Sequence, residues 1–175
     1  MRLQLTVFLA LIAAGCVHLN TDRPEFKDPE VAMVMRIANL GEVREGELAR
    51  EKAAEPAVRD FAVMMVNDHT AASSKTEEAL SIREIVSEDS PLSRQLDAES
   101  GAATERLRAL TGRAFDRAYM DRQVQVHRSL LDLIDTKLMP ATRKKVVKEQ
   151  LTAMRKAVQE HLTIAEQVAK AIPTT

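Results

Sequence analysis

The chain has 175 residues, of which 45% are hydrophobic and 29% are charged, and its formal net charge is −1. This composition excludes a disordered chain and a protein embedded in a membrane throughout. The near-zero net charge gives no indication of nucleic-acid binding. Tryptophan is absent, glycine is rare and strong helix formers dominate, so the composition predicts one all-α domain.

The N-terminal residues 1–15 have the features of a signal peptide. Arg2 is followed by an apolar run that is too short to span a bilayer. Ala13–Cys16 resembles the lipobox of bacterial lipoproteins, although Ala13 stands where leucine is usual. The resemblance implies that Cys16 carries a lipid and, because Val17 follows it, that the protein is sorted to the periplasmic face of the outer membrane. The alternative is a simply cleaved signal, a periplasmic protein and a free thiol at Cys16.

Residues 16–27 are polar and irregular, and we interpret them as a tether that contains a solvated His18. Residues 28–172 form the predicted domain. Apolar residues there recur every three or four positions, and proline or glycine marks each break. We expect long helices over about 28–53, 56–86, 113–139 and 142–171, with a shorter one starting at Ser90-Pro91. This pattern predicts an antiparallel four-helix bundle, of the ferritin-like kind, with one extra connecting helix.

Three histidines lie on or beside the apolar faces of these helices. Phe61, Ala62, Met65 and Val66 form one stripe, and His69 is its next member. His127 and His161 have similar apolar neighbours on their own helices. Glu42 falls within the first helix's stripe, whereas Glu45 does not.

Counting along the hairpins predicts which of these groups lie at the same height. Glu42 is 14 residues before Pro56 and His69 is 13 after it, so antiparallel packing places the two level with each other. His127 and His161 are level only if their turn is a few residues long. We therefore expect the carboxylate and the three imidazoles to converge in the middle of the bundle.

Such a cluster has three interpretations. Glu42, His69, His127 and His161 would suit a divalent transition metal such as zinc, copper, iron or manganese. Alternatively, Glu42 and His69 form a buried polar pair that specifies packing, or the four positions are unrelated. The Glu-x-x-His signature of di-iron bundles is absent, as are nucleophile and phosphate-loop motifs, so we favour a protein that is not an enzyme and assign no catalytic residue.

A secondary polar cluster consists of Asp68, Asp116 and Tyr119. Asp116 lies in the first turn of its predicted helix, where the helix dipole favours a carboxylate. It also shares a face with Gln123 and His127, which leaves a role in the cluster open. Tyr119 is a candidate for a hydrogen bond within the core.

Several segments of the chain resemble the bacterial domain-of-unknown-function 4142 family. They include Met65–Thr70, with its Asp-His-Thr, and Gly112–Tyr119, with its Phe-Asp-Arg-x-Tyr; the later His127 and His161 complete the pattern. The resemblance covers about residues 28–170 and implies a ferritin-like bundle in an exported envelope protein, with no established activity. A proline often found before the last histidine of the family is missing from residues 157–160, which departs from the pattern.

The resulting expectation is an envelope lipoprotein that acts as a non-catalytic interaction or stress-related module. Its membrane contact would be the lipid on Cys16, and no protein partner is indicated by the residues. The alternative is a bundle that binds a transition metal for storage, delivery or redox protection.

Overall fold

The computed structural model describes residues 25–172. The predicted signal peptide and Cys16 lie outside this part of the chain. The described residues form helices and no strand: α1 Asp28–Lys52, α2 Pro56–Ser81, α3 Pro91–Arg108, α4 Gly112–Leu133, the π-helical segment η1 Ile134–Leu138, α5 Met139–Ala141 and α6 Lys145–Ala171. Among them, none is long and apolar enough to cross a membrane.

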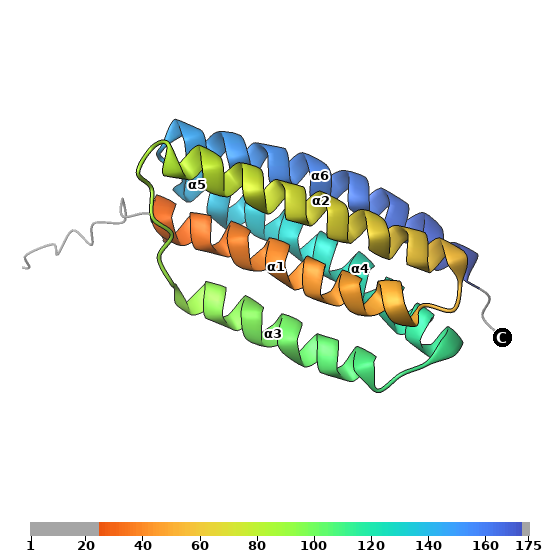
Figure 1. The fold of residues 1–175 in the computed structure, drawn as a ribbon. Helices are drawn as coiled ribbons and strands as arrows, with labels where there is room; N and C mark the ends of the chain where they lie inside the picture. Colours follow the sequence, from red (N-terminus) through yellow and green to blue (C-terminus); the bar gives the residue numbers. More distant parts are fainter. Residues whose placement is uncertain (1–24, 173–175) are drawn as a thin grey trace, which may run out of the picture.

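Two antiparallel hairpins build the bundle. The first consists of α1 and α2, and the second of α4, continued by η1 and α5, and α6 (Figure 1). A long crossover containing α3 joins the hairpins and runs the length of the molecule beside α1. A single long crossover of this kind is the connectivity of ferritin-like bundles. The predicted all-α bundle with an extra helix is confirmed.

Helix α2 ends at Ser81, five residues before the expected Val86, and a Schellman motif explains the difference. Glu84 has a positive φ of 55°, and the Ile85 N–H donates to the Leu80 carbonyl at 3.0 Å. The buried side chains of Leu80 and Ile85 supply the apolar contact that accompanies this motif. The chain thus turns toward α3 while its apolar residues stay in the core.

Pro140 does not end its helix as the sequence predicted. The chain passes through the π-helical turn Ile134–Leu138 and stays helical to Ala141. Within the turn, the Met139 N–H donates to Ile134 O, one residue further back than in an α-helix. The wider turn keeps Ile134, Leu138 and Ala141 buried. The second hairpin therefore turns at residues 142–144, and α6 begins at Lys145.

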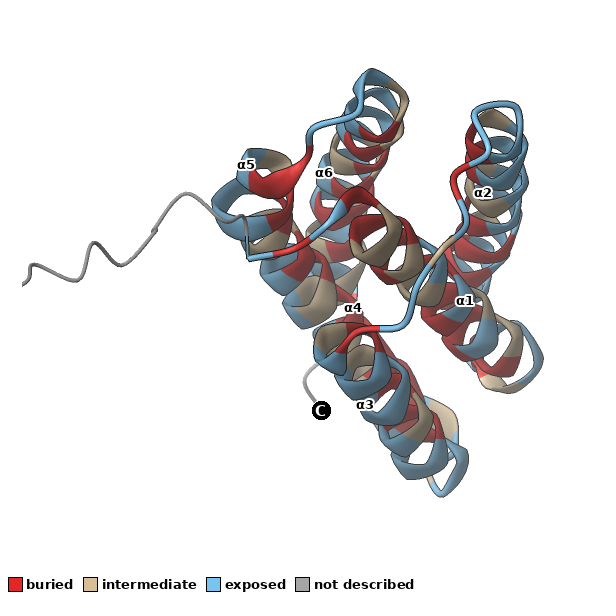
Figure 2. Cartoon of the chain, turned by 90° about the vertical axis from the view of Figure 1, so that its left-hand side faces the viewer, coloured by how far each residue is buried: buried red, intermediate tan, exposed pale blue. Residues whose placement is uncertain are grey.

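The buried residues of the helices face the inside of the bundle (Figure 2), and the apolar ones among them form two cores. One core lies where α1 begins and α2 ends, and includes Met35, Ile134 and Leu151. The other lies at the opposite end, and includes Phe61, Met65 and Tyr119. Between them is a set of buried polar side chains that we call the polar layer: Asn39, Glu42, Glu45, His69, Gln123, His127 and His161.

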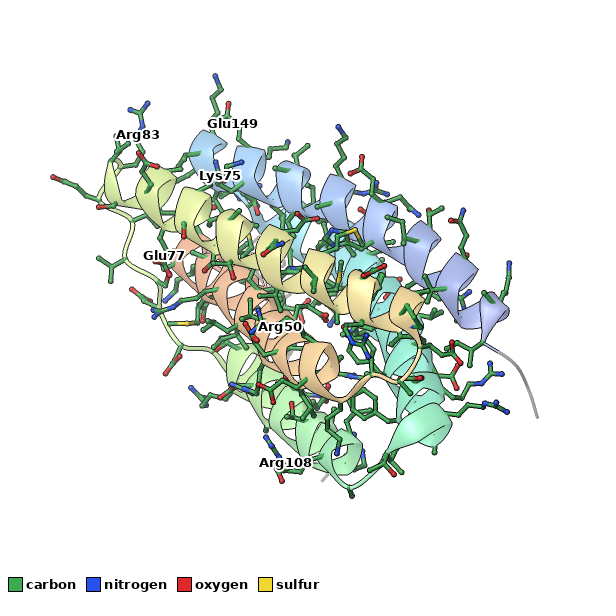
Figure 3. The ribbon with its side chains drawn as sticks, turned by 45° about the vertical axis from the view of Figure 1, so that its right-hand side comes forward. Arg50, Lys75, Glu77, Arg83, Arg108 and Glu149 are labelled. Carbon is green, nitrogen blue, oxygen red and sulfur yellow. The ribbon has the colours of Figure 1, made fainter. Side chains whose placement is uncertain are left out.

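Charged side chains on the outside of the bundle lie in solvent. Arg50, Lys75, Glu77 and Arg108, all exposed, project away from the helices (Figure 3). Arg36 forms an ion pair with Glu77 across α1 and α2 at 3.6 Å, and such an exposed pair adds little to stability. The surface thus contrasts with the polar layer, whose groups are cut off from water.

Each hairpin turn is held by an aspartate from the other hairpin. Asp28, at the start of α1, accepts hydrogen bonds from the backbone N–H groups of Arg143 and Lys144 at 3.0 and 3.1 Å. Asp116, in α4, accepts them from Ala54 and Glu55 at 3.0 and 2.9 Å. Asp116 therefore serves the N-terminus of α2, and not that of its own helix as the sequence suggested. These two aspartates fix the register of the hairpins and, with it, the level of the polar layer.

Candidate metal centre

His69 lies on the buried face of α2, as its stripe with Met65 and Val66 predicts. Its Nδ1–H donates to the Asn39 side-chain oxygen at 2.9 Å. This bond corrects the expected pairing with Glu42, because the partner lies almost one turn earlier on α1. The bond leaves His69 Nε2 without a proton and without a hydrogen-bond partner.

His127 and His161 are held in the same way. His127 Nδ1–H donates to the backbone carbonyl of Gln123, one turn earlier on α4, at 2.8 Å. His161 Nε2–H donates to Asp68 Oδ2, from α2, at 3.0 Å. The second nitrogen of each ring, His127 Nε2 and His161 Nδ1, is buried and has no partner. Asp68 is half exposed, so this side of the cluster is the one nearest to solvent.

The three rings come from three different helices and face one another. Ring centroids are 6.1 Å apart for His69 and His127, 5.1 Å for His69 and His161, and 5.6 Å for His127 and His161. One ligand nitrogen from each ring lies within 4.8 Å of the other two. Of the four residues predicted to converge, the three histidines thus meet, whereas Glu42 does not join them within that limit.

The surroundings keep all three rings neutral. Burial, together with the smaller effects of the neighbouring His161 and His127, lowers the pKa of His69 to about 3. Burial likewise lowers the pKa of His127 to about 4, against the opposing effect of its bond to Gln123. Burial also lowers the pKa of His161, although its bond to Asp68 acts in the other direction. Each free ring nitrogen therefore presents a lone pair at neutral pH.

The polar layer holds an unusual concentration of unsatisfied atoms. Eight buried side-chain nitrogen or oxygen atoms of the described residues lack a hydrogen-bond partner. Every one belongs to the polar layer or to Tyr119, which borders it: Asn39, Glu42, His69, Tyr119, Gln123 (two atoms), His127 and His161. Native proteins satisfy the great majority of such groups, and each exception requires an explanation.

Glu42 lies in the same layer but has a separate environment. Burial raises its pKa from 4.5 to about 7, while the nearby Gln123 side chain and the Arg122 guanidinium act in the opposite direction. One of its oxygens, Oε2, has no partner. Its carboxyl group therefore changes protonation close to neutral pH, unlike an ordinary glutamate.

Glu45, which the sequence placed off the apolar stripe, is buried in the interior. Arg122 donates from Nε and Nη2 to its two oxygens at 3.2 and 3.1 Å, and Ser100 donates to it at 3.2 Å. Its charge is thus fully paired, unlike that of Glu42. Glu45 follows Glu42 by three positions, and this spacing was the signal that both face inward.

Asn39 and Gln123 are the other residues that the sequence did not assign to the site. Asn39 follows the buried Met35 by four residues, and Gln123 stands midway between Tyr119 and His127 at the same spacing. Both therefore continue an apolar stripe with a polar residue, as His69 does. Tyr119 is fully buried, and its hydroxyl has no partner; burial raises its pKa well above 10.0.

The geometry of the cluster is compatible with a tetrahedral ion. Zinc is bound by imidazole at about 2.0–2.1 Å, which separates ligand nitrogens by about 3.3 Å. The observed separations of up to 4.8 Å therefore require each pair to close by no more than about 1.5 Å. Two of the fixed partners, the Gln123 backbone carbonyl of His127 and the Asp68 carboxylate of His161, are of the kinds that metal-binding histidines characteristically have.

Fold and site together define an antiparallel helical bundle with a buried three-histidine cluster. The chain belongs to the DUF4142 family, a domain of unknown function whose family model matches residues 18–168. This confirms the family suggested by the motifs. No curated protein matches the chain.

A solved structure shares the fold. It is a crystal structure of DUF305, described as a secreted protein, from Streptomyces coelicolor. The similarity has a TM-score of 0.66 and covers 81% of this chain and 90% of that chain, with 14% sequence identity. At this identity the likeness extends to the fold alone.

Proposed function

We propose that this protein is a metal-binding helical bundle that holds one divalent transition ion through His69 Nε2, His127 Nε2 and His161 Nδ1. Two observations carry the proposal: each of the three rings has a buried nitrogen without a hydrogen-bond partner, and one ligand nitrogen from each ring lies within 4.8 Å of the other two. The cluster is the metal alternative that the sequence raised, with Glu42 removed from the ligand set.

A purely structural role accounts less well for this arrangement. A buried polar atom without a partner costs about 1–3 kcal/mol, and three converging lone pairs add mutual repulsion. One water molecule donates two hydrogen bonds and so satisfies at most two of the three nitrogens. A cation binds all three at once.

The donor set favours an ion of borderline softness. Neutral imidazoles suit zinc, copper, nickel and iron, whereas magnesium and calcium prefer oxygen ligands. Three histidines also leave a fourth coordination position free, as in zinc sites that bind water or substrate. We assign the ion to storage, delivery or redox protection.

The proposed location is the cell envelope. The lipobox-like Ala13–Cys16 segment supports a lipid on Cys16, and the exported character implied by the family is consistent with it. The lipid would anchor the protein to the periplasmic face of the outer membrane. Metabolic labelling with a radioactive fatty acid tests this. Label is expected on the wild-type protein and not on a Cys16→Ser variant. Absence of label from both proteins would contradict lipidation and would indicate a periplasmic protein whose signal is simply cleaved.

Metal binding is tested by equilibrium dialysis of the full-length protein against zinc, copper, nickel and cobalt, followed by elemental analysis. One ion per chain is expected for the wild type. His69→Ala, His127→Ala and His161→Ala should each lose it. His18→Ala, which removes the fourth histidine of the chain, is the matched control and should retain it. Absence of stoichiometric metal at neutral pH, or equal binding by all four variants, would contradict the proposal.

A further inference from the structure

A second feature is a cavity of about 180 Å³ between α1, α3 and α4, which is open to solvent where the exposed Glu99, Gln125 and Ser129 line it. It exists because α3 runs beside α1 (Figure 1) and makes few contacts with α4. Gly41 meets Ser100 at the wall of this space: a Cβ on Gly41 would lie 2.9 Å from the Ser100 hydroxyl oxygen. None of the three histidines lines the cavity.

The cavity has an apolar wall and a polar end. Ile37, Leu96, Val126 and Leu133 contribute the apolar wall, and Glu42 lies among the polar lining residues. A cavity of about 150 Å³ lined by aliphatic side chains accepts a benzene molecule. The space is therefore adequate for one ring or a short branched chain with a small polar group.

The charges at the cavity favour a cation. Four ionisable groups line it: Glu42, Glu45, Glu99 and Arg122. Glu45 and Arg122 neutralise each other at 3.1 Å. The remaining groups are the exposed Glu99 and the buried Glu42, so the unpaired charge at the cavity is negative.

Glu42 is the group that gives the cavity chemical specificity. Its side chain is buried, with 4% of the residue exposed, and it lines the polar end of the cavity. A cationic N–H donor placed at the polar end would form a charge-assisted hydrogen bond with this carboxylate. A neutral molecule of the same shape would fill the same volume without that bond.

We propose that this cavity binds a small organic amine, with its ammonium group at Glu42 and its apolar body against Ile37, Leu96, Val126 and Leu133. The site is separate from the three-histidine cluster and does not depend on bound metal. It gives the protein a second ligand class, a monoamine of about the size of a substituted benzene ring.

The experiment is calorimetric titration of the full-length protein, as purified, with benzylamine and with the neutral benzyl alcohol at about pH 8, above the pKa of Glu42. Saturable binding of benzylamine, about tenfold or more tighter than that of the alcohol, is expected. Glu42→Gln should bind both probes alike. Glu51→Gln, at an exposed glutamate of α1 that does not line the cavity, is the matched control and should keep the preference for the amine.

A cavity-filling variant tests the location. Ala38→Leu places additional side-chain volume in the space and should remove binding of both probes, while circular dichroism and thermal unfolding report whether the bundle remains folded. Three outcomes would overturn the proposal: no saturable binding of either probe by the wild type, equal binding of amine and alcohol, or a preference for the amine that survives in Glu42→Gln.

Discussion

Each histidine of the cluster uses one ring nitrogen for a fixed partner and leaves the other free. The partners differ in chemistry: an amide oxygen for His69, a backbone carbonyl for His127 and a carboxylate for His161. A carboxylate raises the basicity of the imidazole that it holds. His161 should therefore be the strongest of the three metal ligands, and Asp68 its positioning residue.

Replacing Asp68 by asparagine should weaken metal binding without abolishing it. Loss of such an outer carboxylate typically costs about 10–100-fold in affinity, and competition with a chelator of known affinity measures the change. Asp60→Asn, an exposed aspartate on the same helix, should leave affinity unchanged. Equal affinities of Asp68→Asn and wild type would show that Asp68 does not act on the metal.

Glu42 should make the stability of the metal-free protein depend on pH. Its pKa is about 7 when folded, against an ordinary value of 4.5, so the folded state holds the proton more tightly. The contribution of Glu42 to the free energy of unfolding is full below pH 4.5 and falls as the pH rises through 7.

Glu42→Gln cannot ionise, so it should gain stability relative to wild type across this range, by roughly 3 kcal/mol at most. Urea unfolding of both proteins at a series of pH values measures the difference between their free energies of unfolding. Both proteins contain the same histidines, so the contributions of these residues cancel in the difference. A difference that does not change with pH would mean that Glu42 is solvated.

At the scale of helices, substitution of two glycines by alanine should change the stability of the protein in opposite directions. A Cβ on Gly46 would lie 3.0 Å from Val66 Cγ2 and 3.3 Å from the Ala62 carbonyl oxygen, where α1 and α2 approach closely. A Cβ on Gly101 would meet only Arg44 Nη1 at 3.9 Å. Both glycines lie within helices, so alanine gains similar helix propensity at either site.

Gly46→Ala should therefore destabilise the protein by about 1 kcal/mol, because overpacking exceeds the gain in propensity. Gly101→Ala should stabilise it by about 0.5–1 kcal/mol. Chemical denaturation measures both. If both substitutions stabilised the protein to the same extent, the α1–α2 hairpin would have space for a methyl group at Gly46.

The end of α2 offers a further test. Glu84 has a φ of 55°, a conformation that costs an ordinary side chain about 1 kcal/mol and costs glycine almost nothing. Glu84→Gly should raise the free energy of unfolding by about that amount. Glu78→Gly, which removes the same side chain from inside α2, should lower it by about 1 kcal/mol, and a loss of stability in both variants would contradict the assignment.

The sequence predicted the helices well and their ends less well. Periodicity and proline placed the four long helices, whereas the Schellman turn at Glu84 and the π-helical passage through Pro140 depend on packing that no local signal records. For the site, stripes identified the three histidines. The residue count placed Glu42 level with His69, but the bond goes to Asn39, almost one turn earlier on the same face of α1, because residues three apart on a helix are neighbours and a count does not choose between them.

At the scale of the whole molecule, a polar layer separates two apolar cores. The layer is held in place by hydrophobic packing at both ends, in the cores around Met35 and Phe61. It is also held by Asp28 and Asp116, which accept hydrogen bonds from the two hairpin turns. The bundle can therefore keep unsatisfied groups in its centre without losing its fold. Strain of this kind, sustained by the surrounding structure, is characteristic of functional sites.

X-ray absorption spectroscopy of the zinc-loaded protein tests this account most directly. A first shell with three imidazole nitrogens at about 2.0–2.1 Å is predicted, and it should disappear in His127→Ala while His18→Ala retains it. A first shell made of oxygen, or an imidazole signal that persists unchanged in His127→Ala, would contradict the three-histidine centre.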